Sequence, residues 1–169
     1  MQNHRILAEA CCFAIALAGG ITSAASLSRV DEQFVNSAAT MDMTGAHASQ
    51  MAGNQASHAQ VKNLAQTLVQ DDTDCYNQLV QIGGKAGASV PTGINAAKIP
   101  AIEQLTALKG TRFDRQYVAD EIAAERHAIA VFRREAAQGK NPELKSYAAR
   151  TLPVLEKDLK QAEACAKVG

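Results

Sequence analysis

Residues 83–110, GGKAGASVPTGINAAKIPAIEQLTALKG, form a long connection between two helical halves of the chain. The first part of this connection contains turn-forming glycines and Pro91, which are typical of a loop. The second part predicts a short helix over residues 100–108. A connection of this length allows the chain to cross from one end of a helical bundle to the other.

Four segments around this connection place apolar residues at the spacing of one helix face. They predict helices over residues 30–52, 58–82, 112–138 and 142–167. Each helix start carries a side chain whose oxygen can accept from a backbone N–H of the first turn, and these are Ser28, Ser57, Thr111 and Asn141. The ends of the first three helices are predicted at Gly53, Gly83 and Gly139.

The lengths of the connections predict the topology. Only a few residues separate the first helix from the second and the third from the fourth, so each of these pairs is antiparallel. One long crossover between the pairs is typical of the ferritin-like four-helix bundle, with a short extra helix in the crossover. The alternative is that the short helix doubles back, which produces an up-down-up-down bundle.

The composition supports an all-α fold and argues against other classes. The 169 residues include 17 Lys and Arg against 17 Asp and Glu, so the formal net charge is zero. A nucleic-acid-binding protein normally presents a basic face, and nucleic acid is therefore not an expected partner. Aromatic residues make up 4% of the chain and Trp is absent, whereas a β-barrel or sandwich contains many more aromatic and β-branched residues.

Residues 1–25 predict a secretory signal peptide. Arg5 precedes an apolar run over residues 10–21, and small residues follow up to Ala25, where we expect cleavage. The mature chain, residues 26–169, is then one helical-bundle domain located in the periplasm or at the outer membrane. No later segment is apolar for long enough to predict a transmembrane helix.

Several motifs of the mature chain resemble a bacterial family of exported proteins with a domain of unknown function, whose members are often named outer membrane proteins. The resemblance runs through FVNSAA (34–39) to Asp71, then Leu105 to Gly110, FDRQY (113–117), NPELK (141–145) and TLP (151–153). It covers nearly the whole mature chain at consistent spacing. The resemblance implies a ferritin-like helical bundle, and it implies no β-barrel.

The same resemblance implies a set of metal ligands that this chain does not retain. The family carries His at the positions of Asp72, Glu125 and Asp158, and it favours Glu at the position of Gly45. Carboxylates have replaced all three His residues, and the carboxylate on the first helix is missing. A ligand set cannot be transferred from the family unchanged.

Asp72, Glu125 and Asp158 each lie in or beside the apolar stripe of a helix, near the middle of the bundle in either topology. Buried carboxylates cannot all remain ionised without compensation. A metal ion, a proton, water or a basic side chain can supply it, and the candidate basic side chains are Arg126, Arg133, Arg150 and Lys157. Because these ligands offer only oxygen, a metal site here favours a hard cation.

Met43, His47 and Met51 follow one another at four-residue spacing and form a second candidate metal site on the first helix. Thioether and imidazole groups suit Cu(I). The alternative is that these methionines pack against neighbouring elements or a second copy of the chain.

Cys75 and Cys165 are the two cysteines of the mature chain, and the topology decides whether they can form a disulfide. In an up-down-up-down bundle they fall within reach after small shifts, but in a ferritin-like bundle they lie roughly 20 Å apart along the axis. We expect two free thiols.

Catalytic motifs are missing from the sequence, so an enzyme is not expected. The chain has no glycine-rich phosphate loop and no nucleophile elbow. We expect a non-enzymatic structural or interaction module of the cell envelope, whose candidate partners are an envelope protein, a membrane surface or a second copy of the chain. The alternative is a metal-binding protein, with a metal ion as the candidate cofactor. A di-iron oxidase would need the missing His ligands and the missing Glu.

Overall fold

The computed structural model describes residues 27–94 and 96–167, and the predicted signal peptide lies outside them. Within these residues the chain forms α-helices and one short 3-10 helix, and it forms no strand. The long helices are α1 (Arg29–Gln55), α2 (Ala59–Lys85), α4 (Thr111–Gln138) and α5 (Pro142–Cys165). The 3-10 turn Ala96–Lys98 and the short α3 (Ile99–Ala107) lie in the crossover. The predicted all-α fold class is confirmed.

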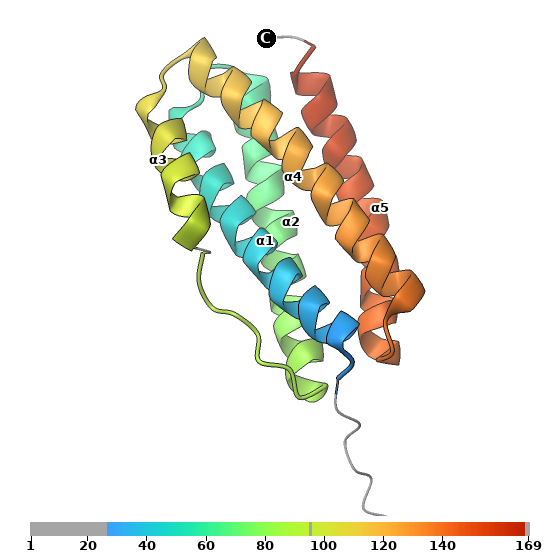
Figure 1. Cartoon of the computed structure of the whole chain (residues 1–169). Coiled ribbons are helices and arrows are strands. Elements are labelled where there is room, and N and C mark those ends of the chain that lie inside the picture. Colours follow the sequence, from blue (N-terminus) through green and yellow to red (C-terminus); the bar gives the residue numbers. More distant parts are fainter. Residues whose placement is uncertain (1–26, 95, 168–169) are drawn as a thin grey trace, which may run out of the picture.

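The four long helices form a bundle in which α1 packs on α2 and α4, and α5 packs on α4 and α2. The chain crosses the length of the bundle between the end of α2 and the start of α4, so these two helices run in the same direction (Figure 1). This is the predicted ferritin-like arrangement rather than the up-down-up-down alternative. The short helix α3 covers one side of the bundle, next to α1 and α4.

Two of the predicted helix starts are confirmed. The hydroxyl of Ser28 accepts a hydrogen bond from the backbone N–H of Asp31 at 3.2 Å. The side chain of Asn141 accepts from the first turn of α5. Two of the predicted helix ends are wrong, since Gly53 and Gly83 lie inside helices that continue to Gln55 and Lys85.

The helix caps predicted at Ser57 and Thr111 are wrong. The residues that precede α2 and α4 are His58 and Gly110, and neither caps its helix with a side-chain hydrogen bond. The hydroxyl of Ser57 donates to the buried carboxylate of Asp114 instead. The hydroxyl that the local pattern assigned to α2 as an acceptor therefore donates to a charged carboxylate of another helix.

The core consists of two apolar clusters at different heights in the bundle. The lower cluster surrounds Phe34, Phe132 and Tyr147, whose rings contact one another. The upper cluster surrounds Phe113 and Tyr117, whose rings stack at 6.1 Å between centroids. Alanines fill much of the remaining helix contact, so the helices approach one another closely.

Cys75 and Cys165 are free, as predicted. Cys75 is buried in the second half of α2, whereas the thiol of Cys165 donates to the backbone oxygen of Gln60 at the start of α2. In the part of the chain that the structure describes, none of the helices combines the length and the apolar character needed to span a membrane.

Candidate functional site

A layer of carboxylates separates the two apolar clusters of the core. Each long helix contributes to it, and the members are Asp42 from α1, Asp72 from α2, Glu121 and Glu125 from α4, and Asp158 from α5. On every one of these helices, residues of one cluster precede the acid in sequence and residues of the other cluster follow it. The five side chains therefore occupy the same level of the bundle, and we call them the carboxylate layer.

Four members of the carboxylate layer are almost completely buried. The exposed fraction is 2% for Asp158, 4% for Asp42, 5% for Glu121 and 6% for Glu125. Charged side chains are almost never buried to this degree without a partner. The burial of the layer therefore needs a physical explanation.

Asp72 is half-buried and points toward α1. A Cβ atom on Gly45 of α1 would overlap the carboxylate of Asp72. The carboxylate thus occupies the space that a side chain at position 45 would take. The sequence suggested that Gly45 is the loss of a ligand, whereas the structure shows that it makes room for the carboxylate of Asp72.

The structure brings together the three acids that the sequence singled out. Neighbouring negative charge from Glu125 and Asp158, among others, contributes to the raised pKa of Asp72. Asp158 likewise contributes to the raised pKa of Glu125. The predicted convergence at mid-bundle is observed in the described residues.

Most of the basic side chains that could have neutralised the carboxylate layer pair with groups outside it. Arg126 and Arg133 form ion pairs with surface glutamates of α5, each at 2.8 Å. Arg150 donates to the hydroxyl of Ser146 on its own helix. Lys157 alone among them reaches the layer, because its Nζ lies 2.7 Å from Asp71 and 3.4 Å from Asp158.

Several carboxylate oxygens of the layer have no hydrogen-bond partner. They are Oδ2 of Asp42, Oε2 of Glu125 and Oδ1 of Asp158, and all three atoms are buried. A buried acceptor without a donor costs about 1–3 kcal/mol, and more if it is charged. Oδ1 of Asp158 has the positive Nζ of Lys157 at 3.4 Å, but Oδ2 of Asp42 and Oε2 of Glu125 require a proton or a cation.

Burial raises the pKa of every carboxyl group in the layer, and the neighbouring carboxylates raise it further. The pKa of Glu121 and that of Glu125 are raised to about 8, and that of Asp158 to about 6. The pKa values of Asp42 and Asp72 are raised well above the ordinary range of an aspartate. The layer therefore retains protons at neutral pH unless a cation replaces them.

The chemistry of these residues suits a hard cation, but their present arrangement is not a closed coordination sphere. Among the described residues, no three Asp, Glu, His or Cys side chains are grouped so that they could hold one ion. A cation would have to draw the flexible carboxylates inward by changes of side-chain rotamer. Oxygen ligands of this kind suit Ca²⁺, Mg²⁺ or Mn²⁺ better than a soft metal.

Sequence reasoning missed two members of the layer, Asp42 and Glu121. Asp42 lies four residues after the buried Ala38 of the first helix, and Glu121 lies four residues before Glu125. Both therefore continue a stripe at helical spacing, which is the signal that could have identified them.

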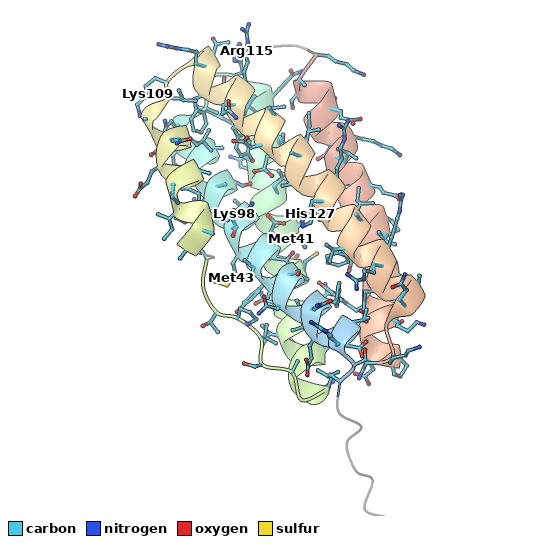
Figure 2. All side chains as sticks on the ribbon, in the orientation of Figure 1. Met41, Met43, Lys98, Lys109, Arg115 and His127 are labelled. Carbon is cyan, nitrogen blue, oxygen red and sulfur yellow. The ribbon has the colours of Figure 1, made fainter. Side chains whose placement is uncertain are left out.

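The three residues of the second predicted metal site, on α1, differ in their exposure to solvent. His47 is exposed, whereas Met43 and Met51 are half-buried. Met51 packs against the upper apolar cluster. Figure 2 shows Met43 on the side of α1 toward the crossover, whereas Met41 lies between α1 and α4.

The comparison with protein families identifies the chain. Residues 16–165 match the family described as "Domain of unknown function (DUF4142)". The chain belongs to this family. The search of curated proteins found no match for this DUF4142 chain.

Two solved structures share the fold of this DUF4142 chain. The first is described as a DUF305 fragment from Deinococcus radiodurans, with a TM-score of 0.74 and 14% identity over 85% of this chain and 99% of that chain. The second is described as CopM in the Ag-bound form, with a TM-score of 0.64 and 16% identity over 79% of this chain and 93% of that chain. At these identities the similarity establishes the helical-bundle fold alone.

Proposed function

We propose that this DUF4142 protein is a non-enzymatic metal-binding bundle of the bacterial cell envelope, and that the carboxylate layer binds a hard divalent cation. One observation carries the proposal. Carboxylates from all four long helices meet between two apolar clusters, and two of their buried oxygens, Oδ2 of Asp42 and Oε2 of Glu125, have neither a hydrogen bond nor an ion pair. A divalent cation would supply the missing positive charge and would join the four helices at mid-height.

The proposed location in the envelope rests on the signal-peptide pattern of residues 1–25, with Arg5 before an apolar run and small residues up to Ala25. The outer membrane label of the resembling family is compatible with this location. Fractionation of cells that express the full chain tests it. We expect the processed protein in the periplasm or with the outer membrane, and a cytoplasmic, unprocessed protein would contradict the proposal.

Elemental analysis followed by titration tests the metal site. The protein is purified without chelators, analysed for metals, stripped, and titrated with Mn²⁺, Ca²⁺ and Mg²⁺ in a calorimeter. We expect one of these cations to bind stoichiometrically, and we expect Asp72→Asn and Glu125→Gln to lose that binding. The matched control is Asp74→Asn, because Asp74 lies on the same helix as Asp72 but is exposed.

Two results would contradict the metal site. The first is that none of the three cations binds the parent protein. The second is that Asp72→Asn and Glu125→Gln bind metal as well as Asp74→Asn does. In either case the carboxylate layer is not a metal site.

A second candidate function is a structural or interaction module whose carboxylate layer stays protonated. The raised pKa of Glu121 and of Glu125, each about 8, favours it, because protonated carboxyls need no metal at neutral pH. Its partner would be an envelope protein, a membrane surface or a second copy of the chain. A metal-free protein whose stability does not respond to divalent cations would support this candidate.

A soft-metal site at Met43, His47 and Met51 is the third candidate. The exposed imidazole of His47 and the silver-bound state described for CopM, which shares the fold, support it. Titration with Ag⁺ tests this site separately from the carboxylate layer. We expect His47→Ala, but not Asp72→Asn, to weaken Ag⁺ binding if these residues bind the ion.

A further inference from the structure

A groove of about 520 Å³ lies between α1, α3 and α4. Thr44, Gly45 and Ala48 of α1 form one wall, and Ala101, Ile102 and Leu105 of α3 form the opposite wall. Figure 2 shows His127 of α4 at the side of the bundle where α1 and α4 meet. The groove is open to solvent next to the middle of the bundle, where the carboxylate layer lies.

The floor of this groove reaches the carboxylate layer at two points. Glu121 belongs to the layer and also lines the groove. Gly45 lines the groove as well, and the carboxylate of Asp72 lies where its Cβ atom would be. The wall between the groove and Asp72 is therefore only the backbone of α1.

The short helix α3 is the least firmly packed wall of the groove. Leu105 is its one buried residue, and Ile99 at its start is 46% exposed. Its C-terminal end is attached to α1, because Nε2 of Gln55 donates to the backbone oxygens of Thr106 and Leu108 at 3.0 and 2.6 Å. The N-terminal end of α3 can therefore move with little loss of packing.

On the side of the carboxylate layer away from the groove, a positively charged lysine side chain covers the acids. Nζ of Lys157 lies between Asp71 of α2 and Asp158 of α5, at 2.7 and 3.4 Å. A metal ion that approached from this side would meet a positive charge first. On the groove side, the exposed carboxylate of Asp120 lies beside Glu121 and attracts cations, and the positively charged Lys98 of the crossover also lines the groove.

We propose that a hydrated divalent cation reaches the carboxylate layer through the groove between α1, α3 and α4, and that Glu121 is the first carboxylate of the layer that it meets. This inference rests on the proposed metal-binding function. The glycine at position 45 leaves only the backbone of α1 between the groove and the carboxylate of Asp72. The remaining carboxylates then bind the ion deeper in the bundle.

Bulky substitutions in the groove test the path in the full chain. Ala124 of α4 and Ala101 of α3 are exposed and line the groove from different sides, so Ala124→Trp and Ala101→Trp both obstruct it. The matched control is Ala149→Trp, because Ala149 is an exposed alanine of α5 that does not line the groove. Circular dichroism verifies that each variant folds.

The first readout needs no metal. Carbodiimide activation with glycinamide, followed by peptide mass spectrometry, measures which carboxyl groups small solutes reach. We expect coupling at Glu121 in the parent and in Ala149→Trp, and about tenfold slower coupling in the groove variants. Coupling at the exposed Glu143 serves as the internal reference. Unchanged coupling at Glu121 in both groove variants would overturn the path.

The second readout is the rate of Mn²⁺ uptake, followed by the electron paramagnetic resonance signal of free Mn²⁺. We expect the groove variants to slow uptake about tenfold while the equilibrium Kd stays within about twofold of the parent, because the ligands are intact. Equal uptake rates in all variants would overturn the path. If the parent binds no Mn²⁺, the metal-binding function fails for this ion, and the coupling at Glu121 still decides whether the groove gives access to the layer.

Discussion

Asp31 of α1 and Asp114 of α4 perform the same task in opposite halves of the bundle. The carboxylate of Asp31 accepts from the backbone N–H groups of Lys140 and Asn141 in the turn between α4 and α5. The carboxylate of Asp114 accepts from those of Ser57 and His58 in the turn between α1 and α2. An aspartate of each antiparallel helix pair thus accepts hydrogen bonds from the backbone of the turn in the other pair, and so holds that turn in place.

The correspondence extends along the chain. Asp114 lies 83 positions after Asp31, and Lys140 and Asn141 lie the same 83 positions after Ser57 and His58. Glu125 of the carboxylate layer also lies 83 positions after Asp42. The two helix pairs therefore place equivalent residues at equivalent points of the bundle.

We predict that Asp31→Asn and Asp114→Asn each lower the free energy of unfolding by about 1.5–3 kcal/mol, because hydrogen bonds to a charged acceptor are lost. Asp114→Asn is expected to cost more, since the hydroxyl of Ser57 and Nδ1 of His58 also bond to this carboxylate. Urea unfolding at pH 6 measures both. Asp120→Asn, at an exposed site, is the control, and an equal effect in the control would refute the prediction.

We predict that acid weakens these two turn contacts. Burial by itself raises the pKa of Asp31, but the hydrogen bonds from Ser28, Asn141 and Lys140 outweigh it and lower the pKa to about 2. The stabilisation is complete above the ordinary aspartate pKa of 3.8 and is lost as the pH falls toward 2. Thermal unfolding between pH 5 and pH 2 should show this loss, and Asp31→Asn should show a smaller one.

We predict the opposite trend at higher pH. The pKa of Glu125 is raised from 4.5 to about 8, so the unfolded chain ionises first and stability falls as the pH rises through this range. Each such group contributes up to about 1.4 kcal/mol per pH unit. Glu125→Gln should flatten the decline between pH 5 and pH 8, which urea unfolding measures.

A bound divalent cation should reverse this decline, because it stabilises the ionised carboxylates of the folded protein. Mn²⁺ is therefore expected to raise the Tm more at pH 8 than at pH 5. An equal rise in Asp72→Asn would show that the ion acts outside the carboxylate layer.

We predict that two glycines of α1 respond differently to alanine. A Cβ atom on Gly53 would meet nothing within 4 Å, so Gly53→Ala should stabilise the helix by about 0.5–1 kcal/mol. A Cβ atom on Gly45 would overlap the carboxylate of Asp72, so Gly45→Ala should stabilise less and should weaken metal binding about tenfold or more. Unfolding and titration of the two variants test this, and identical behaviour would contradict it.

We predict an energetic coupling between Ser49 and Tyr117, which join α1 to α4 just above the carboxylate layer. Their hydroxyl oxygens lie 2.9 Å apart, and both side chains are buried. Ser49→Ala and Tyr117→Phe should each cost about 1–2 kcal/mol, and the double variant should cost about 1 kcal/mol less than their sum. Strict additivity in urea unfolding would show that the hydrogen bond contributes nothing.

Features that depend on neighbouring residues were predictable from the sequence. The caps at Ser28 and Asn141 act within one helical turn, and the apolar stripes repeat at the period of the helix. The long connection over residues 83–110 favoured a crossover once two antiparallel pairs were recognised, although a connection that doubles back stayed open. The acids Asp72, Glu125 and Asp158 were identifiable because each lies in or beside such a stripe.

Features that depend on the partner of a long or charged side chain were decided only by the tertiary structure. The hydroxyl of Ser57 bonds to Asp114 rather than to its own helix, and Arg126 and Arg133 pair with surface glutamates rather than with the layer. Asp72 occupies the space left by Gly45, which lies on another helix. The amino-acid order by itself determined the helices and the antiparallel pairing of those joined by short connections, because these follow from local backbone and apolar patterning. Which groups meet across the core was determined by packing, because electrostatic and hydrogen-bond energies depend on distances that only the assembled helices set.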